Sequence, residues 1–156
     1  VGSDKKLEIA LQYGANSVIN YQSENVRDRI KELTDGRGID VCFEMIGGDL
    51  FEIMARSMNW NGRLLPIGFA SGEIPSVKMN LPLVKNYSIV GSVVGAWWER
   101  CRPEAIKAHD EIFRWASEGK IHPKTDRVMP LEEARRALEL LVNREVTGRI
   151  ALSIAR

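Results

Sequence analysis

The sequence predicts an α/β protein built on a parallel β-sheet. Short apolar segments, several of them rich in β-branched residues, alternate along the chain with amphipathic segments of helical periodicity. Turns that contain glycine or asparagine separate many of these segments. Such alternation indicates right-handed βαβ units, in which each helix connects one parallel strand to the next.

The expected helices have apolar residues three or four positions apart, which gives each helix one apolar face. Gly14 and Gly119 follow two of them and suit a helix end, because glycine readily adopts the left-handed backbone found there. In chain order, the sequence predicts helices over residues 5–13, 23–33, 50–58, 103–118 and 131–142.

The expected strands are short and mostly apolar, as buried parallel strands are. Glycine turns at Gly36 and Gly62 lead into two of them. Pro66 is unusual inside an expected strand, because proline cannot donate a ladder hydrogen bond. In chain order, the sequence predicts strands over residues 17–21, 39–44, 63–69, 88–94 and 150–154.

Composition excludes several classes of function. The 156 residues carry a formal net charge of +1, which favours neither nucleic acid nor an anionic membrane surface. No apolar run approaches the roughly 20 residues of a membrane span. Cys42 and Cys101 are isolated, and His109 and His122 have no partner at ligand spacing, so we expect neither a disulfide framework nor a metal site. A reducing cytoplasm is the expected location.

A series of short segments carries a family resemblance. They are residues 2–7, 14–21, 36–41, 62–68, 71–75, 119–121, 130–134 and 146–150. In this order and at these spacings, the chain resembles the zinc-independent quinone oxidoreductases of the medium-chain dehydrogenase/reductase superfamily. The resemblance extends over nearly the whole chain.

The resemblance implies an incomplete fold. The expected architecture is a Rossmann-type doubly wound parallel sheet whose first strand and glycine fingerprint are missing. The chain starts at Val1 without an initiator Met, as expected of a fragment cut at the end of a strand. Residues 1–122 would form a partial dinucleotide-binding domain, and residues 123–156 would return to an absent catalytic domain.

The resemblance also implies NADPH as the cofactor. Enzymes specific for NADH carry an acid at the end of the second strand, where it accepts a hydrogen bond from the ribose 2′-hydroxyl. That position falls at Val1 and Gly2, and neither is acidic. Ser3, Lys6 and Tyr21 match family positions that contact the 2′-phosphate of NADPH.

Each of these three residues also has a structural interpretation. Ser3 suits a helix N-cap, Lys6 a solvated helix position, and Tyr21 the end of a strand. Asp4 is a nearby acid that would weaken phosphate binding.

Two strand ends are further candidates for cofactor contact, because ligands of open α/β sheets lie outside the carboxyl ends of the strands. By resemblance, the first faces the adenosine end of the cofactor and the second faces the nicotinamide. The alternative for each residue is ordinary turn chemistry. The residues are Met45, Ile46 and Gly47 after one strand, and Gly68, Phe69, Ala70 and Ser71 after the other.

Trp97 and Trp98 follow the last expected Rossmann strand. In the family this stretch lies near the substrate cleft, where two tryptophans could wall a flat apolar substrate. The alternative is packing at a subunit interface, because in the family the strand from Ser88 to Val94 pairs with a second subunit. A homodimer through this strand is therefore expected.

The function that follows is part of an oxidoreductase. The resemblance implies hydride transfer from NADPH to a quinone or to an activated alkene, either an enone or an enoyl thioester. No catalytic side chain stands out, since the cofactor carries this chemistry. The chain by itself is expected to be inactive. The alternative is a non-catalytic nucleotide-binding or dimerisation module.

Overall fold

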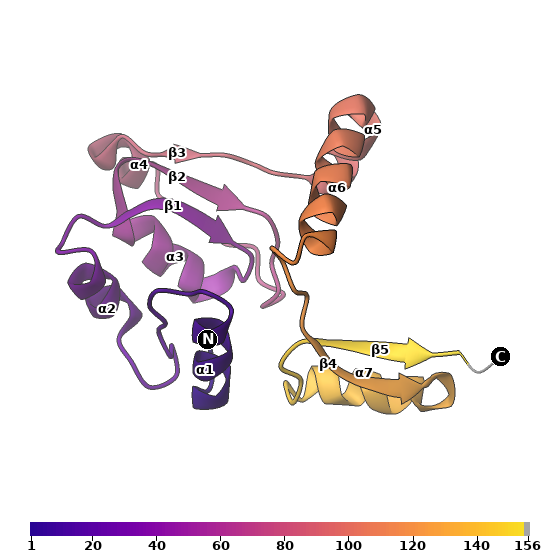
Figure 1. The fold of residues 1–156 in the computed structure, drawn as a ribbon. Coiled ribbons are helices and arrows are strands. Elements are labelled where there is room, and N and C mark those ends of the chain that lie inside the picture. Colours follow the sequence, from indigo (N-terminus) through magenta and orange to yellow (C-terminus); the bar gives the residue numbers. More distant parts are fainter. Residues whose placement is uncertain (155–156) are drawn as a thin grey trace. The chain divides into compact units, whose positions relative to one another are not determined.

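Parallel strands alternate with helices in both halves of the chain, as the sequence predicts (Figure 1). A computed structural model describes residues 1–154. The chain forms two compact units, Val1–Trp97 and Trp98–Arg156. The expected domain boundary after residue 122 concerns a catalytic domain outside this chain, and it stays a prediction.

The first unit contains a parallel three-stranded sheet in the order β1-β2-β3. Helix α3 connects β1 to β2 and helix α4 connects β2 to β3 along the chain, which gives the βαβ pattern and confirms the predicted fold class. The strands are β1 (Ile39–Glu44), β2 (Met58–Pro66) and β3 (Ser88–Ile89); the helices are α1 (Asp4–Gln12), α2 (Val26–Leu33), α3 (Gly48–Ser57) and α4 (Asn80–Lys85).

The core of this unit lies where α3 packs against β1 and β2. It consists of Cys42, Phe51, Ala55, Met58, Leu64 and Tyr87. Along β1, Cys42 and Glu44 are buried whereas Val41 and Phe43 are exposed, Phe43 by 65%. Parallel strands are usually covered on both faces. Within residues 1–154, β1 is therefore a sheet edge with one apolar face uncovered.

The segment over 17–21, expected to be a strand, pairs through its backbone with a single residue within 1–154, Val1. The amino group of Val1 donates to the carbonyl of Ile19 at 2.8 Å, and the amide of Tyr21 donates to the carbonyl of Val1 at 3.0 Å. These bonds to either side of one residue are the pattern of a parallel ladder. Because Val1 alone supplies them among the described residues, no regular strand forms.

The expected strand from Ser88 to Val94 is only partly correct. Of these residues, only Ser88 and Ile89, which form β3, pair with β2. The last bond of this ladder runs from the amide of Val90 to the carbonyl of Leu64 at 2.9 Å. Without a further partner in the described part of the chain, the strand stops, and residues Val94–Arg100 form helix α5.

The second unit is a parallel pair of strands with helices. Strands β4 and β5 pair along their whole length, with α7 between them in the sequence. Helix α4, helix α5 and strand β4 are not among the elements that the sequence predicts. The elements are α6 (Arg102–Ser117), β4 (Thr125–Pro130), the 3-10 turn η1 (Leu131–Glu133), α7 (Ala134–Val142) and β5 (Arg149–Ser153).

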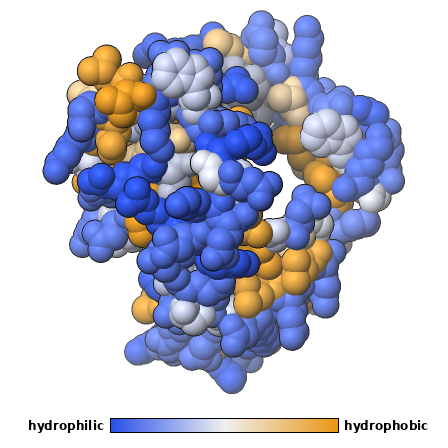
Figure 2. Space-filling model, turned by 90° about the vertical axis from the view of Figure 1, so that its left-hand side faces the viewer, coloured by the Kyte–Doolittle hydropathy of each residue, from blue (hydrophilic) through white to orange (hydrophobic). Residues whose placement is uncertain are grey.

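Apolar side chains reach the surface of the molecule in several separate places, shown in orange in Figure 2. None of the helices within residues 1–154 has the length and apolar composition needed to cross a membrane.

Candidate functional site

The carboxyl ends of β1 and β2 lie at one edge of the sheet, and their following loops are joined by main-chain hydrogen bonds. The amide of Ala70 donates to the carbonyl of Met45 at 2.9 Å, and the amide of Ser71 donates to the carbonyl of Ile46 at 2.8 Å. The structure thus places the two predicted strand-end segments side by side, joined through their backbones. They lie at the carboxyl ends of the strands, where nucleotides bind in open α/β sheets.

Glu44 holds the first of these loops, a role that the sequence analysis missed. Its side chain is buried, and Oε1 accepts from the amides of Ile46 at 2.8 Å and Gly47 at 3.0 Å. A buried carboxylate requires such partners, because burial removes its hydration. The signal in the sequence was an acid at the carboxyl end of a mostly apolar strand.

Both the backbone conformation at position 47 and the atoms around it require glycine there. Its φ of 77° and ψ of −158° lie in a region that only glycine readily occupies. A Cβ at this position would lie 2.5 Å from the carbonyl oxygen of Glu73 and 3.3 Å from both the Phe69 ring and the Ser71 hydroxyl. Gly47 therefore allows the two loops to approach. At Gly68 the nearest atom to an added Cβ is 3.6 Å away, an ordinary contact.

An apolar groove of about 610 Å³ brings together four of the predicted site residues. They come from α1, from the segment over 17–21 and from the loop after β1: Lys6, Tyr21, Met45 and Ile46. Apolar residues of α2 and α3 line the rest of it, among them Val26, Ile30, Leu50 and Met54. Val1 and Ile39, the first residue of β1, also line it, so the groove extends along the uncovered edge of β1. Its apolar lining with few polar groups resembles that of many cofactor sites.

At one end of the groove, Tyr21 packs over Gly2. A Cβ on Gly2 would lie 2.5 Å from the Tyr21 hydroxyl, so a larger residue there would displace the ring. Ser3 is the N-cap of α1, yet its hydroxyl makes no capping hydrogen bond. Asp4, the neighbouring acid, accepts a hydrogen bond from the side chain of Asn20 at 2.9 Å. This contact directs the Asp4 carboxylate toward Asn20.

Trp97 and Trp98 lie on helix α5 rather than at the end of a strand, which corrects the expectation for this stretch. Neither residue lines the groove. In the second unit, Trp98 makes an edge contact with the ring of His109 at a centroid distance of 5.7 Å. His109 in turn lies 4.5 Å from the ring of Phe113. His109 is therefore part of an aromatic cluster.

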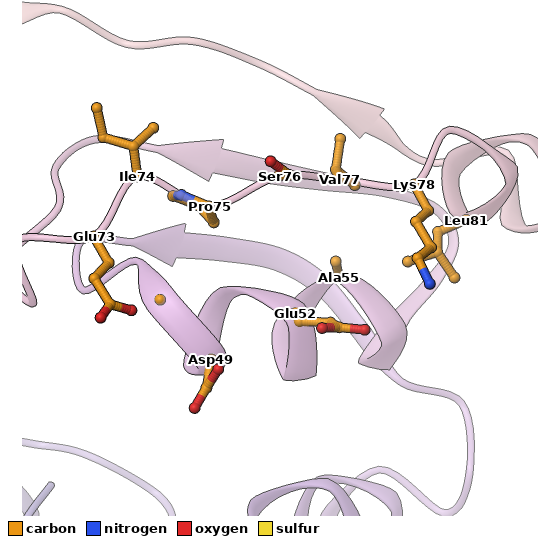
Figure 3. A pocket seen from close by; sticks show the side chains of 11 residues that line it. Asp49, Glu52, Ala55, Glu73, Ile74, Pro75, Ser76, Val77, Lys78 and Leu81 are labelled. Carbon is orange, nitrogen blue, oxygen red and sulfur yellow. The ribbon is translucent and has the colours of Figure 1, made fainter.

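A second cavity, of about 390 Å³, lies between α3 and the segment over 73–78 (Figure 3). Asp49 and Glu52 on α3 and Glu73 on the facing segment give it acidic side chains. Glu52 bonds to Arg56 at 2.6 Å, and this hydrogen bond lowers the pKa of Glu52. Within residues 1–154, no group of three or more His, Cys, Asp or Glu side chains is arranged to hold a metal ion.

A known family model matches most of the chain. Residues 1–111 match the model described as zinc-binding dehydrogenase. The match includes every predicted site residue, from Ser3 to Trp98.

Individual relatives agree with this match. The chain is 37% identical to quinone oxidoreductase-like protein 2 of Rattus norvegicus, over 98% of this chain and 44% of that protein. The chain thus spans less than half the length of this curated relative.

Two solved structures share the fold. An Escherichia coli quinone oxidoreductase complexed with NADPH superposes with a TM-score of 0.83 at 28% identity, covering 95% of this chain and 46% of that one. A 2-haloacrylate reductase superposes with a TM-score of 0.84 at 25% identity, covering 99% of this chain and 49% of that one.

Proposed function

This chain belongs to the zinc-binding dehydrogenase family, and from that premise we propose that it is the cofactor-binding part of an NADPH-dependent oxidoreductase. The observation that carries the proposal is the groove, where Lys6 and Tyr21 meet the loop after β1. In this arrangement the groove residues hold one end of the cofactor, and the hydrogen-bonded strand-end loops lie along it.

The preference for NADPH rests on charge. Lys6, which lines the groove, supplies a cation to the 2′-phosphate. Ser3 is not part of that lining, and in this proposal its hydroxyl, which is not used to cap α1, adds a second contact. Charge-assisted hydrogen bonds of this kind are among the stronger polar contacts in proteins. The Escherichia coli relative, which is complexed with NADPH, supports the same cofactor.

The proposed reaction is hydride transfer to a quinone or to an activated alkene, an enone or enoyl thioester. NADPH supplies the hydride when bound. Quinones and such alkenes share a carbon made electron-poor by a conjugated carbonyl. The relatives described as quinone oxidoreductase and 2-haloacrylate reductase support this range of acceptors. Trp97 and Trp98 are proposed to contact the acceptor, with subunit packing as their alternative role.

The remaining expectations belong to the same proposal. We propose a homodimer formed through the strand that begins at Ser88, whose outer edge is free in the described part of the chain. We also propose a cytoplasmic location and no zinc requirement. Elemental analysis of the purified protein tests the last point, and stoichiometric zinc would contradict it.

An absorbance assay of NADPH oxidation tests the function. A protein that carries this chain together with the amino-terminal part found in its relatives is expected to oxidise NADPH when a quinone or an enone is added. This chain by itself is expected to show no turnover. Nucleotide binding without oxidation by the longer protein, with either acceptor, would favour the non-catalytic module instead.

A further inference from the structure

The opposite edge of the sheet, where the strands begin, carries a pocket of different character. It has a volume of about 260 Å³ and is lined by residues that precede β1, β2 and β3. Five cationic side chains face it against a single carboxylate, that of Asp28. The cationic residues are Arg27, Lys31, Arg37, Arg56 and Lys85.

This concentration of charge is local, because the whole chain has a net charge of only +1. Two of the cations have carboxylate partners: Arg56 pairs with Glu52 at 2.6 Å, and Arg37 lies 3.7 Å from Asp40. Within residues 1–154, the other three cations form no ion pair with a carboxylate. The pocket therefore retains unneutralised positive charge.

Two main-chain carbonyl groups hold the side chain of Lys85 in the pocket. Its ammonium group donates to the main-chain carbonyls of Arg56 and, at 2.9 Å, of Met58, where α3 ends. Partial burial and the positive charge of Arg27 lower the pKa of Lys85. The positive charges of Lys85 and Arg27 are thus close enough to repel each other.

Helix α2 adds two further unfavourable placements. Arg27 lies in its first turn, near the positive end of the helix dipole, where a cation is disfavoured. Lys31 follows four residues later, so two like charges are neighbours on one helix face. An anion bound between these side chains would relieve both repulsions.

We propose that this pocket binds a small phosphate-bearing anion, separately from the cofactor groove. Guanidinium groups match the oxygens of a phosphate in pairs, and several cations together favour a ligand with more than one negative charge. The volume lies below the roughly 300–1,000 Å³ of typical sites for larger organic ligands, which suits a group of the size of a phosphate or diphosphate. The inference does not rest on the proposed oxidoreductase function.

Calorimetric titration of the full 156-residue chain with inorganic phosphate and with diphosphate, at constant ionic strength, tests the proposal. We expect saturable binding, tighter for diphosphate, with the amide resonances of Gly36 and Gly38 shifting in an NMR titration. Equal concentrations of chloride should shift neither amide. No saturable binding, or shifts that chloride reproduces, would overturn the proposal.

Matched variants locate the site. Arg27→Gln combined with Lys31→Gln should weaken diphosphate binding by at least 10-fold. Arg102→Gln combined with Lys107→Gln removes the same two charges from α6 and should change binding less than 2-fold. If the two double variants lost the same diphosphate affinity, the effect would come from the overall charge of the protein, and the proposed site would be wrong.

The cofactor groove offers a competing phosphate site at Lys6, so Lys6→Ala is the third variant. It should leave the shifts of Gly36 and Gly38 intact even if it abolishes NADPH binding. Loss of those shifts in Lys6→Ala would assign the phosphate to the groove and overturn the separate site. Circular dichroism of each variant confirms that the compared proteins are folded.

Discussion

Both carboxylate oxygens of Glu44 accept a hydrogen bond from the amide of Gly47, Oε1 at 3.0 Å and Oε2 at 3.1 Å. Glu44 ends β1 and is only 3% exposed, whereas Gly47 begins the turn into α3. The pair fixes the loop that contributes Met45 and Ile46 to the groove. The shape of the proposed cofactor site therefore depends on a residue that does not line it.

Replacing Glu44 with Ala should lower the free energy of unfolding by about 1–3 kcal/mol, since it leaves buried amides without an acceptor. Glu44→Gln keeps one acceptor oxygen and should lose less. Chemical denaturation measures both changes. The exposed Glu8 is the control, and a loss in Glu8→Ala as large as in Glu44→Ala would contradict the role of the carboxylate.

Gly47→Ala should destabilise the first unit by at least about 1–3 kcal/mol, because its backbone region is almost closed to other residues. The contact with the Glu73 carbonyl adds to this cost. Gly72→Ala is a matched control, with a φ of +83° but no atom within 4 Å of an added Cβ. Thermal unfolding of the two variants should show the larger loss for Gly47, and equal losses would rule out the contribution of the close contact.

Lys6→Ala should weaken NADPH binding by about 1–3 kcal/mol in the longer protein, with little change for NADH. The reason is that only NADPH carries the 2′-phosphate. Lys5→Ala is the neighbouring control, because Lys5 is exposed and does not line the groove. Equal losses for the two cofactors would remove the assignment of Lys6 to the phosphate.

The second unit should lose stability in acid through Asp126. Hydrogen bonds from Thr147 and Arg127 lower the pKa of Asp126 to about 2, against 3.8 for the free group. A folded-state pKa below the unfolded one stabilises the fold above about pH 4, and this stabilisation disappears as the pH falls toward 2. Unfolding of Asp126→Asn and of the unchanged protein should therefore differ most near pH 6 and converge near pH 2. A constant difference across that range would contradict the linkage.

The two cysteines should differ in reactivity. Burial, together with the negative charge of Glu44, raises the pKa of the Cys42 thiol to about 11. Since the thiolate is the reactive form, Cys42 should react slowly with a thiol reagent at pH 8 in the folded protein. The variant Cys101→Ser isolates Cys42 for this measurement. Reaction at the rate of the denatured protein would show that Cys42 is not protected.

Much of the first unit could be predicted from sequence because local patterns determine it. β1 has the bounds that its apolar run predicts, and α1 begins one residue before the expected helix. The family resemblance is confirmed by the match of residues 1–111 and by the quinone oxidoreductase relatives. These features need only periodicity, turns and segment order.

The features that were wrong or missed depend on partners distant in sequence. The stretch that includes Val93 and Val94 has strand-like composition, but no described strand pairs with it, and a helix starts there. Glu44 holds its loop by accepting hydrogen bonds from the amides of Ile46 and Gly47, and these amides point at the carboxylate only once the turn into α3 has formed. The cationic pocket gathers side chains from three helices and a turn, so the overall charge of the chain conceals it.

The uncovered edge of β1, with Phe43 beside it, also has a consequence for assembly. A strand attached to the same polypeptide would reach this edge at a high effective concentration, independent of how much protein is present. A strand supplied by another molecule would have to find it by diffusion, so its occupancy would rise and fall with dilution. Covalent continuity would therefore convert a concentration-dependent association into a fixed element of the sheet.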